Sequence, residues 1–274
     1  MNAPEAEILL ALAVRAALSA GREITDVYAG PDFGVETKSD RTPLTEADRR
    51  AHRAIGQGLA TSGLPVLSEE GRAIPYKERR RWKRFWLADP LDGTKEFIKR
   101  NGEFTVNIAL IDNGRPVLGV VLAPALGELY AGGEEFGAFK IESDKLEKSE
   151  ISARTIAAAG KRLPLARPRG PHRIVASRSH MTPETEAFIE KKRAEHGGAD
   201  IVSKGSSLKF CLVAEGAADV YPRFGPTMEW DTAAGHAVAS AAGCRVTQAD
   251  GSTPLVYNKE DLRNPWFIVR SAAR

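Results

Sequence analysis

The sequence predicts a layered α/β (α+β) fold. Segments with helical and with strand periodicity alternate along the chain, and an Asn113-Gly114 turn separates two β-rich runs. The 274 residues are 42% hydrophobic, so the chain can bury a large core, as one domain or as two closely packed lobes.

The first part of the chain alternates between helix and strand signals. Residues 5–28 and 46–60 have the apolar spacing of helices, and Thr45 is a suitable N-cap for the second. Residues 64–68 and 85–89 are short apolar runs that lead into acidic residues, and we expect both to be strands.

A hairpin and a boundary are predicted next. Residues 104–111 and 116–122 are β-rich, and the Asn-Gly dipeptide between them is the strongest short hairpin signal. Residues 141–173 are first charged and then rich in proline and glycine, which predicts a linker or lobe boundary. We therefore expect two lobes, 1–140 and 141–274, that form one compact unit.

Alternation resumes in the second part of the chain. Thr182 and Pro183 are typical of a helix start, and Gly243 is typical of a helix end. The elements expected here are a strand at 174–176, a helix at 183–195, a helix at 206–215, a strand at 219–222 and a helix at 231–242.

Charge excludes one class of partner. With 39 basic and 36 acidic residues the net charge is +3, so we expect no nucleic-acid polymer as partner, although the pI is about 8.8. The densest basic run, residues 77–84, is interpreted as a solvated loop or helix face, and the neighbouring Trp82, Phe85 and Trp86 as core residues rather than a base-stacking platform.

Cysteine usage and the first helix predict a cytoplasmic protein. Cys211 and Cys244 lie among apolar residues without a CxxC spacing, so we interpret both as buried free thiols. Arg15 interrupts the first apolar run, which lacks a basic leader, and no stretch is long enough to span a bilayer. Weak peripheral association with the inner face of the membrane stays open.

Carboxylates gather at three separate places in apolar or small-residue surroundings. They are Glu69-Glu70, the motif DPLDGT at 89–94, and Trp230-Asp231. A carboxylate in such surroundings loses hydration unless positive charge compensates it. Hard divalent cations such as Mg2+ prefer oxygen ligands of this kind, so the sequence predicts one metal site built from all three places.

The 89–94 motif also suits a phosphate. Asp89 ends a predicted strand, and Gly93 and Thr94 open a helical segment whose free N–H groups suit a phosphate oxygen. Taken singly, each acid has a simpler interpretation. Glu69-Glu70 suits a solvated pair, Asp92 a turn residue or N-cap, Asp231 an N-cap and Asp48 a first-turn acid favoured by the helix dipole.

Taken together, these segments resemble the inositol monophosphatase superfamily of Mg2+-dependent, lithium-sensitive phosphatases. The matching segments are LTEAD at 44–48, LSEE at 67–70, DPLDGTKEFI at 89–98 and WDTAAGHA at 230–237. Two longer strings, TKEFIKRNGEF at 94–104 and GSSLKFCLVAEG at 205–216, look like the CysQ-type 3'(2'),5'-bisphosphate nucleotidases of that superfamily.

The resemblance implies an α-β-α-β-α sandwich and the hydrolysis of 3'-phosphoadenosine 5'-phosphate, and its 5'-phosphosulfate, by metal-activated water. It implies two or three Mg2+ per site, with Mn2+ as a substitute. The implied metal ligands are Glu69, Asp89, Asp92, Asp231 and the carbonyl of Leu91. Catalytic roles fall on Asp48, Thr94 and Glu69, with Thr94 as a relay to a carboxylate and Glu70 aligning Glu69 or a bound water.

The substrate side is also carried by the resemblance. Lys209 and Arg223 are expected near the phosphate that is not cleaved, and Ser177, His180 and Gly205 near the adenosine. His180 alone also suits a surface loop and Lys209 a solvated helix face. The reacting phosphate is expected at Glu69, Leu91, Asp92, Gly93, Thr94 and Asp231, while Lys95 and Lys99 are cations without an assigned role.

Two alternatives stay open at this point. One is a phosphatase of the same fold that acts on inositol monophosphate or a sugar bisphosphate. The other is a metal-dependent nucleotide-binding protein without hydrolysis, although no catalytic carboxylate or threonine is missing. Residues 142–172 match no motif, and the oligomeric state is not predicted.

Overall fold

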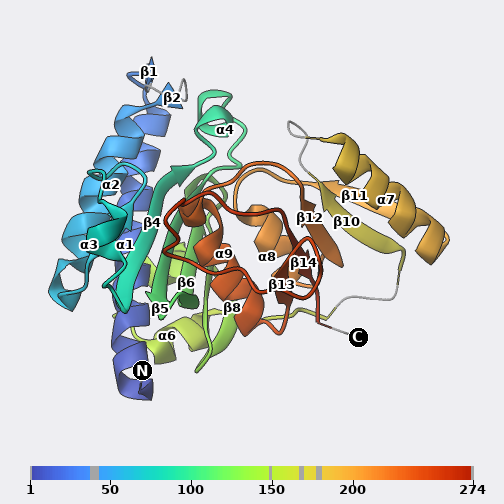
Figure 1. Ribbon diagram of the computed structural model, residues 1–274. Helices are drawn as coiled ribbons and strands as arrows, with labels where there is room; N and C mark the ends of the chain where they lie inside the picture. The colour runs from blue at the N-terminus through green and yellow to red at the C-terminus, as the bar shows by residue number, and fades with distance from the viewer. Residues whose placement is uncertain (1, 38–42, 148–149, 167–169, 177–180, 273–274) are drawn as a thin grey trace.

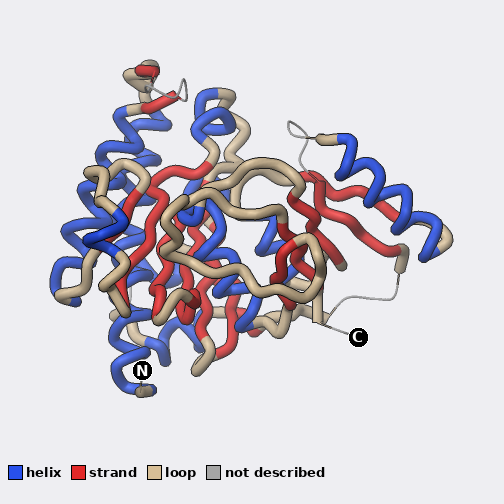
Figure 2. Tube along the Cα trace, viewed as in Figure 1, coloured by secondary structure: helices blue, strands red, loops and turns tan. Residues whose placement is uncertain are grey.

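The computed structural model of the protein describes residues 2–37, 43–147, 150–166, 170–176 and 181–272. Five layers of helix and sheet follow one another across the molecule, with the two sheets in the second and fourth layers (Figure 1). Figure 2 shows the same alternation of blue helices and red strands. The predicted layered α/β fold is therefore confirmed.

The larger sheet has seven strands in the order β3-β4-β5-β6-β7-β8-β9, and all neighbours pair antiparallel except β3 and β4. Its strands are β3 Val66–Ser68, β4 Arg84–Asp92, β5 Thr105–Asp112, β6 Arg115–Ala123, β7 Glu128–Gly133, β8 Gly137–Glu142 and β9 Lys161–Arg162. The predicted hairpin joins β5 and β6, and Asn113 and Gly114 both have positive φ, as a two-residue hairpin turn of type I′ requires.

The smaller sheet has five strands in the order β11-β10-β12-β14-β13. Its parallel pairs are β10 with β11 and with β12, and its antiparallel pairs are β12 with β14 and β13 with β14. The strands are β10 His172–Ala176, β11 Ala199–Ser203, β12 Val220–Arg223, β13 Arg245–Gln248 and β14 Phe267–Arg270. A separate two-stranded ribbon pairs β1 Glu36–Thr37 with β2 Pro43–Leu44.

Helices form the other three layers (Figure 1). One layer covers the outer face of the larger sheet, one lies between the sheets, and one covers the outer face of the smaller sheet. The layer on the larger sheet contains α1 Ala3–Ala29 and α2 Glu46–Leu59. The layer between the sheets contains α8 Leu208–Ala214 and α9 Glu229–Ala241, and the layer on the smaller sheet contains α7 Pro183–His196. The short helices are α3 Tyr76–Arg79, α4 Thr94–Ile98, α5 Asp144–Glu147 and α6 Ala153–Ala159.

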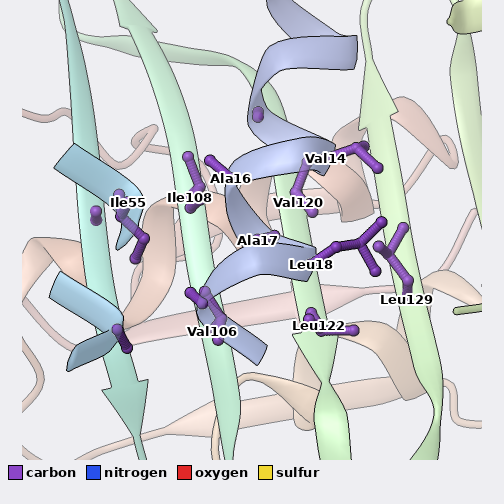
Figure 3. Packing of buried hydrophobic residues seen from close by; sticks show 14 of the residues in the cluster. Val14, Ala16, Ala17, Leu18, Ile55, Val106, Ile108, Val120, Leu122 and Leu129 are labelled. Carbon is purple, nitrogen blue, oxygen red and sulfur yellow. The ribbon is translucent and has the colours of Figure 1, made fainter. Parts of the chain in front are cut away.

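Alternating apolar side chains explain why the layers adhere. Figure 3 shows Val14 and Leu18 of α1 over Val120 and Leu122 of β6, all of them fully or almost fully buried. The opposite face of the same sheet packs on α8 and α9 in a second apolar cluster, and Ile189 of α7 belongs to a third. None of the helices in the described ranges has the length and apolar character that crossing a bilayer requires.

Several expectations are corrected by the structure. β4 continues to Asp92 rather than ending at Asp89. Residues 141–173 are predicted to be a linker or lobe boundary. They are not an irregular linker, because their described part carries α5, α6 and β9, the last strand of the larger sheet. The basic run at 77–84 is not fully solvated, because Arg79 is buried. The division into lobes at residue 140 stays a prediction.

Other expectations are confirmed. Phe85 and Trp86 are fully buried, and the partly buried Trp82 packs beside Phe85. Cys211 and Cys244 are free and buried. Thr182 caps α7, accepting a hydrogen bond from the N–H of Thr185.

Glycine allows α9 to approach the larger sheet closely. A Cβ atom at Gly119 of β6 would lie 2.4 Å from the carbonyl oxygen of Ala234 and 2.8 Å from the Cβ of Ala237. Gly235 faces the other way, and a Cβ there would lie 2.6 Å from the ring of Phe210 in α8. Small residues on both sides therefore fix the position of α9 between the sheets.

This close packing predicts a position-specific effect of one methyl group. Gly119→Ala should lower the free energy of unfolding by about 1–3 kcal/mol, because α9 must move. Gly56→Ala, on the exposed face of α2 with no atom within 4 Å of the added Cβ, should instead raise it by about 0.4–1 kcal/mol. Urea unfolding of both variants checks this, and equal effects would contradict the packing argument.

Candidate metal and phosphate site

A cavity of about 490 Å³ opens where the two sheets and the middle helices meet. It gathers residues from the segment after β3, the end of β4, α4, the loop before α8, α8, β12 and α9. The predicted site residues that line it are Glu69, Asp89, Leu91, Asp92, Gly93, Thr94, Gly205, Lys209, Arg223 and Asp231. Segments far apart in the sequence are thus brought to one place.

Three of the predicted metal carboxylates converge in this cavity. Glu69, Asp89 and Asp231 each offer an oxygen, and the three oxygens lie within 4.8 Å of one another. Glu69 directly follows β3, where its N–H donates to the carbonyl of Ala88 on β4. Asp231 occupies the third position of α9 and accepts a hydrogen bond from the N–H of Met228, 2.8 Å away. Met228, and not Asp231, is therefore the N-cap.

A β-bulge accounts for the arrangement of the two acids on β4. Asp89 pairs with Asn107 of β5 and Asp92 pairs with Thr105. The chain therefore advances three residues on β4 and only two on β5 between these pairs, so β4 contains one extra residue. Such a bulge re-aims side chains and accommodates a proline, here Pro90, that cannot pair. The Asp89 carboxylate also accepts a hydrogen bond from the N–H of Leu91 at 3.0 Å.

Burial and crowding make the carboxylates costly to ionise. Asp89 is 1% exposed, and burial, followed by the repulsion of Glu69, Asp92 and Asp231, raises its pKa well above the usual range. Burial and the charge of Asp92 likewise raise the pKa of Asp231. No ion pair joins Asp89 to a basic side chain among the described residues. An all-oxygen donor set in this condition fits a divalent cation.

Asp92 lies beside this trio in a different environment. Its Oδ2 is 3.3 Å from the hydroxyl of Ser207 and 3.5 Å from the side-chain nitrogen of Asn107. Burial raises its pKa, and the neighbouring charge of Lys209 and the hydrogen bond from Asn107 oppose that rise. The roles of Asp92 and of the Leu91 carbonyl in metal binding stay predictions.

Gly93 and Thr94 occupy the turn into α4. Gly93 has φ of 92°, and a Cβ there would lie 2.3 Å from the hydroxyl of Ser206. The hydroxyl of Thr94 is 3.4 Å from Oδ1 of Asp48 and 3.4 Å from the carbonyl of Leu91. The other oxygen of Asp48 accepts bonds from the N–H and hydroxyl of Thr45, both at 2.6 Å. Asp48 is thus both a first-turn acid of α2 and a partner of Thr94.

Four residues to which the sequence assigns no role hold the loops of the site together: Glu103, Asn107, Ser206 and Ser207. Ser206 donates to the carbonyl of Asp92 or of Glu103, both 2.8 Å away, and the Glu103 carboxylate accepts from the N–H of Gly205. The hydroxyl of Ser207 donates to the carbonyl of Asp231, 2.7 Å away, and accepts a hydrogen bond from the side-chain nitrogen of Asn107 at 3.0 Å. A polar Asn107 inside the apolar run of β5 was the available signal.

Two cations stand opposite the carboxylates. Lys209 is 8% exposed, and burial lowers its pKa to about 8, although the charge of Asp92 partly opposes this. Arg223 donates to the carbonyl of Pro226, while its buried Nε has no hydrogen-bond partner among the described residues. The interpretation of Lys209 as a solvated helix residue is therefore wrong.

The remaining predicted residues have mixed outcomes. Lys95 and Lys99 line the cavity. Glu70 acts electrostatically on His52 and Arg49 of α2, and its role beside Glu69 stays a prediction. Ser177 and His180 lie outside the described residues, so their expected contact with the adenosine stays a prediction as well.

Comparison with known proteins identifies the family of this chain. A family model described as the inositol monophosphatase family matches residues 5–269. The 3'(2'),5'-bisphosphate nucleotidase CysQ of Escherichia coli K12 is 48% identical over 258 residues, which cover 92% of this chain and 96% of that protein. Its Haemophilus influenzae counterpart is 34% identical over 266 residues, which cover 96% and 93%. The crystal structure of CysQ from Bacteroides thetaiotaomicron superposes with a TM-score of 0.91 at 52% identity and covers 98% of each chain. The chain therefore belongs to the inositol monophosphatase family.

Proposed function

We propose that this protein is a Mg2+-dependent 3'(2'),5'-bisphosphate nucleotidase. Its substrate would be 3'-phosphoadenosine 5'-phosphate, cleaved to AMP and phosphate, and also the corresponding 5'-phosphosulfate. The observation that carries the proposal is one cavity lined both by the carboxylate trio and by two cations, the buried Lys209 and the half-buried Arg223. The relatives named CysQ support the choice of substrate.

The chain's own residues divide the work. Glu69, Asp89 and Asp231 would hold the metal, together with Asp92 and the Leu91 carbonyl. Two or three Mg2+, or Mn2+ in their place, would lower the pKa of the attacking water and neutralise charge on the reacting phosphate. Thr94 would hydrogen-bond that water and pass its proton toward Asp48, since a neutral hydroxyl is a poor base by itself.

Lys209 and Arg223 would bind the phosphate that is not cleaved. Arg223 offers a buried N–H that has no other partner in the described ranges, and buried polar groups of this kind need one. Lys209 lies near the Arg223 charge, so an anion between them would relieve their repulsion. A substrate with two phosphates therefore fits the cavity better than a monophosphate. We also propose that the protein acts in the cytoplasm and that its two lobes form one compact unit around the small nucleotide.

Phosphate release decides among substrates. With Mg2+ and equal sub-saturating concentrations, we expect 3'-phosphoadenosine 5'-phosphate to be hydrolysed at least tenfold faster than inositol 1-phosphate or fructose 1,6-bisphosphate, since about 1.4 kcal/mol of extra binding suffices. A preference for a sugar phosphate would keep the metal site and overturn the substrate. Absence of release from all three would favour a binding protein without hydrolysis.

Removing one trio charge should separate activity from stability. Asp89→Asn keeps an acceptor for the Leu91 N–H but removes a ligand and a repelled charge. Mg2+-dependent kcat/KM should fall more than about 100-fold, beyond the usual loss of an outer-shell partner. When a chelator removes the metal, the Tm of Asp89→Asn should exceed that of the unchanged protein by roughly 2–4 °C for each kcal/mol of repulsion relieved. Melting curves with and without Mg2+ check this, with Asp112→Asn, half-buried elsewhere in the sheet, as the control that gains nothing.

The pKa of Lys209 predicts how nucleotide affinity changes with pH. Because this pKa is lowered from 10.5 to about 8, the charge is present at pH 7 and lost as pH rises through 8. KM should therefore increase above pH 8. Lys209→Met should raise KM at pH 7 by roughly 10–100-fold, the loss of one hydrogen bond to a charged group, and remove this pH dependence. Lys209→Arg should keep KM low to higher pH, and a wild-type KM that stays constant to pH 9.5 would contradict the assignment.

A further inference from the structure

A buried acid that the proposed chemistry does not use stands two residues before Asp231. Glu229 begins α9 and is fully buried. Its Oε2 accepts a hydrogen bond from the N–H of Asn258 at 2.6 Å, and its Oε1 accepts one from the N–H of Lys259 at 3.0 Å. The ammonium group of Lys259 pairs with the same Oε1. A buried charge is tolerated only with such complete pairing.

Residues 257–264, here named the clamp loop, supply the hydrogen-bond partners of Glu229. Figure 2 shows it in tan, passing in front of α9. The N–H of Glu229 donates to the carbonyl of Leu262. The side chain of Asn264 lies 2.7 Å from the carbonyl of Met228 and 3.0 Å from the hydroxyl of Thr232. The clamp loop therefore holds the first turn of α9 from several directions.

Arg79 of α3 forms hydrogen bonds with the clamp loop. Its guanidinium donates to the carbonyl of Glu260 at 2.7 Å and to the side chain of Asn258 at 2.9 Å. Asn258 in return donates to the carbonyl of Arg79 at 2.8 Å. Arg79 belongs to α3, which follows Glu69 in the chain. The clamp loop thus bridges α3 and the first turn of α9, which carries Asp231.

Helix geometry explains why this bridge affects Asp231. Residues two apart on an α-helix point about 200° away from each other, since each step turns about 100°. Glu229 is held on the side of α9 opposite to Asp231. Rotation of the first turn would pull the Glu229 carboxylate from its donors, so those donors fix the direction of the Asp231 carboxylate. The close packing at Gly119 limits how near α9 lies to the larger sheet, and the donors to Glu229 add a separate restraint on the first turn of the helix.

We propose that Glu229, held by Lys259 and by the Arg79-anchored clamp loop, is a positioning residue that orients Asp231 for metal binding. The inference rests on the proposed function, in which Asp231 is a ligand. Loss of Glu229 should therefore weaken metal binding and slow turnover. It should leave nucleotide affinity unchanged, because the residues proposed to bind the uncleaved phosphate, Lys209 and Arg223, lie on α8 and β12.

The test is direct Mn2+ binding to purified, metal-free protein, followed by the electron paramagnetic resonance signal of free Mn2+, together with kcat and KM. Glu229→Gln preserves the shape of the side chain but places an N–H group against backbone N–H donors. We expect Mn2+ affinity and kcat to fall by about 10–100-fold, as for other groups that orient ligands. KM for 3'-phosphoadenosine 5'-phosphate should stay within about twofold, because the phosphate-binding cations are unchanged.

Matched variants separate the outcomes. Arg263→Ala removes an exposed ion pair with Asp261 on the same clamp loop and should leave Mn2+ binding unchanged. Asp231→Asn should weaken it at least as much as Glu229→Gln. If Asp231→Asn weakens binding and Glu229→Gln does not, the positioning role is overturned while the metal site stands. If neither does, the proposed metal site itself fails.

A second variant covers the case in which Glu229→Gln does not fold, as judged by circular dichroism. Lys259→Met keeps both backbone N–H donors to Glu229 and removes only the ammonium group. A positioning role predicts weaker Mn2+ binding with unchanged KM in this variant too. Wild-type Mn2+ affinity in folded Lys259→Met would then overturn the proposal.

Discussion

Mutual repulsion of Glu69, Asp89 and Asp231 is the constraint around which this structure is organised. Their oxygens lie within 4.8 Å of one another, and the burial of Asp89 removes water that would otherwise screen its charge. A fold relaxes such repulsion whenever its backbone allows the groups to separate. Here each carboxylate is fixed by a separate rigid device: the end of a paired strand, a β-bulge, and the third position of a helix whose start is held by Glu229.

Close packing transmits this constraint to the rest of the molecule. Gly119 and Gly235 let α9 lie against both β6 and Phe210 of α8. The first turn of α9 then contacts the loop before α8 through Ser207, whose hydroxyl lies between the Asp231 carbonyl and the Asp92 carboxylate. Lys209 follows two residues later in α8. The carboxylate trio and Lys209 are therefore built on the same small group of elements.

The acidic motifs could be predicted because Glu69 and Asp89 follow apolar runs and because the order of the motifs along the chain resembles one superfamily. The bulge at Pro90 could not, since pairing register depends on β5 as well as on β4. Arg79 looks like any member of a solvated basic run, and only the distant clamp loop explains its burial. Strands β7, β8, β11, β13 and β14 escaped prediction because their short runs depend on neighbours for their conformation.

The carboxylate trio also has a topological consequence. Asp89 and Asp231 are separated by about half the length of the chain, and they belong to different layers of the fold. A cation shared between them would act as a removable cross-link at the ends of a very long loop, and bringing those ends together has an entropic cost that grows with loop length. Since no single element carries the whole donor set, a partly folded chain holds such a cation poorly. If the trio binds the proposed cation, its binding would report that both halves of the chain have reached their final positions.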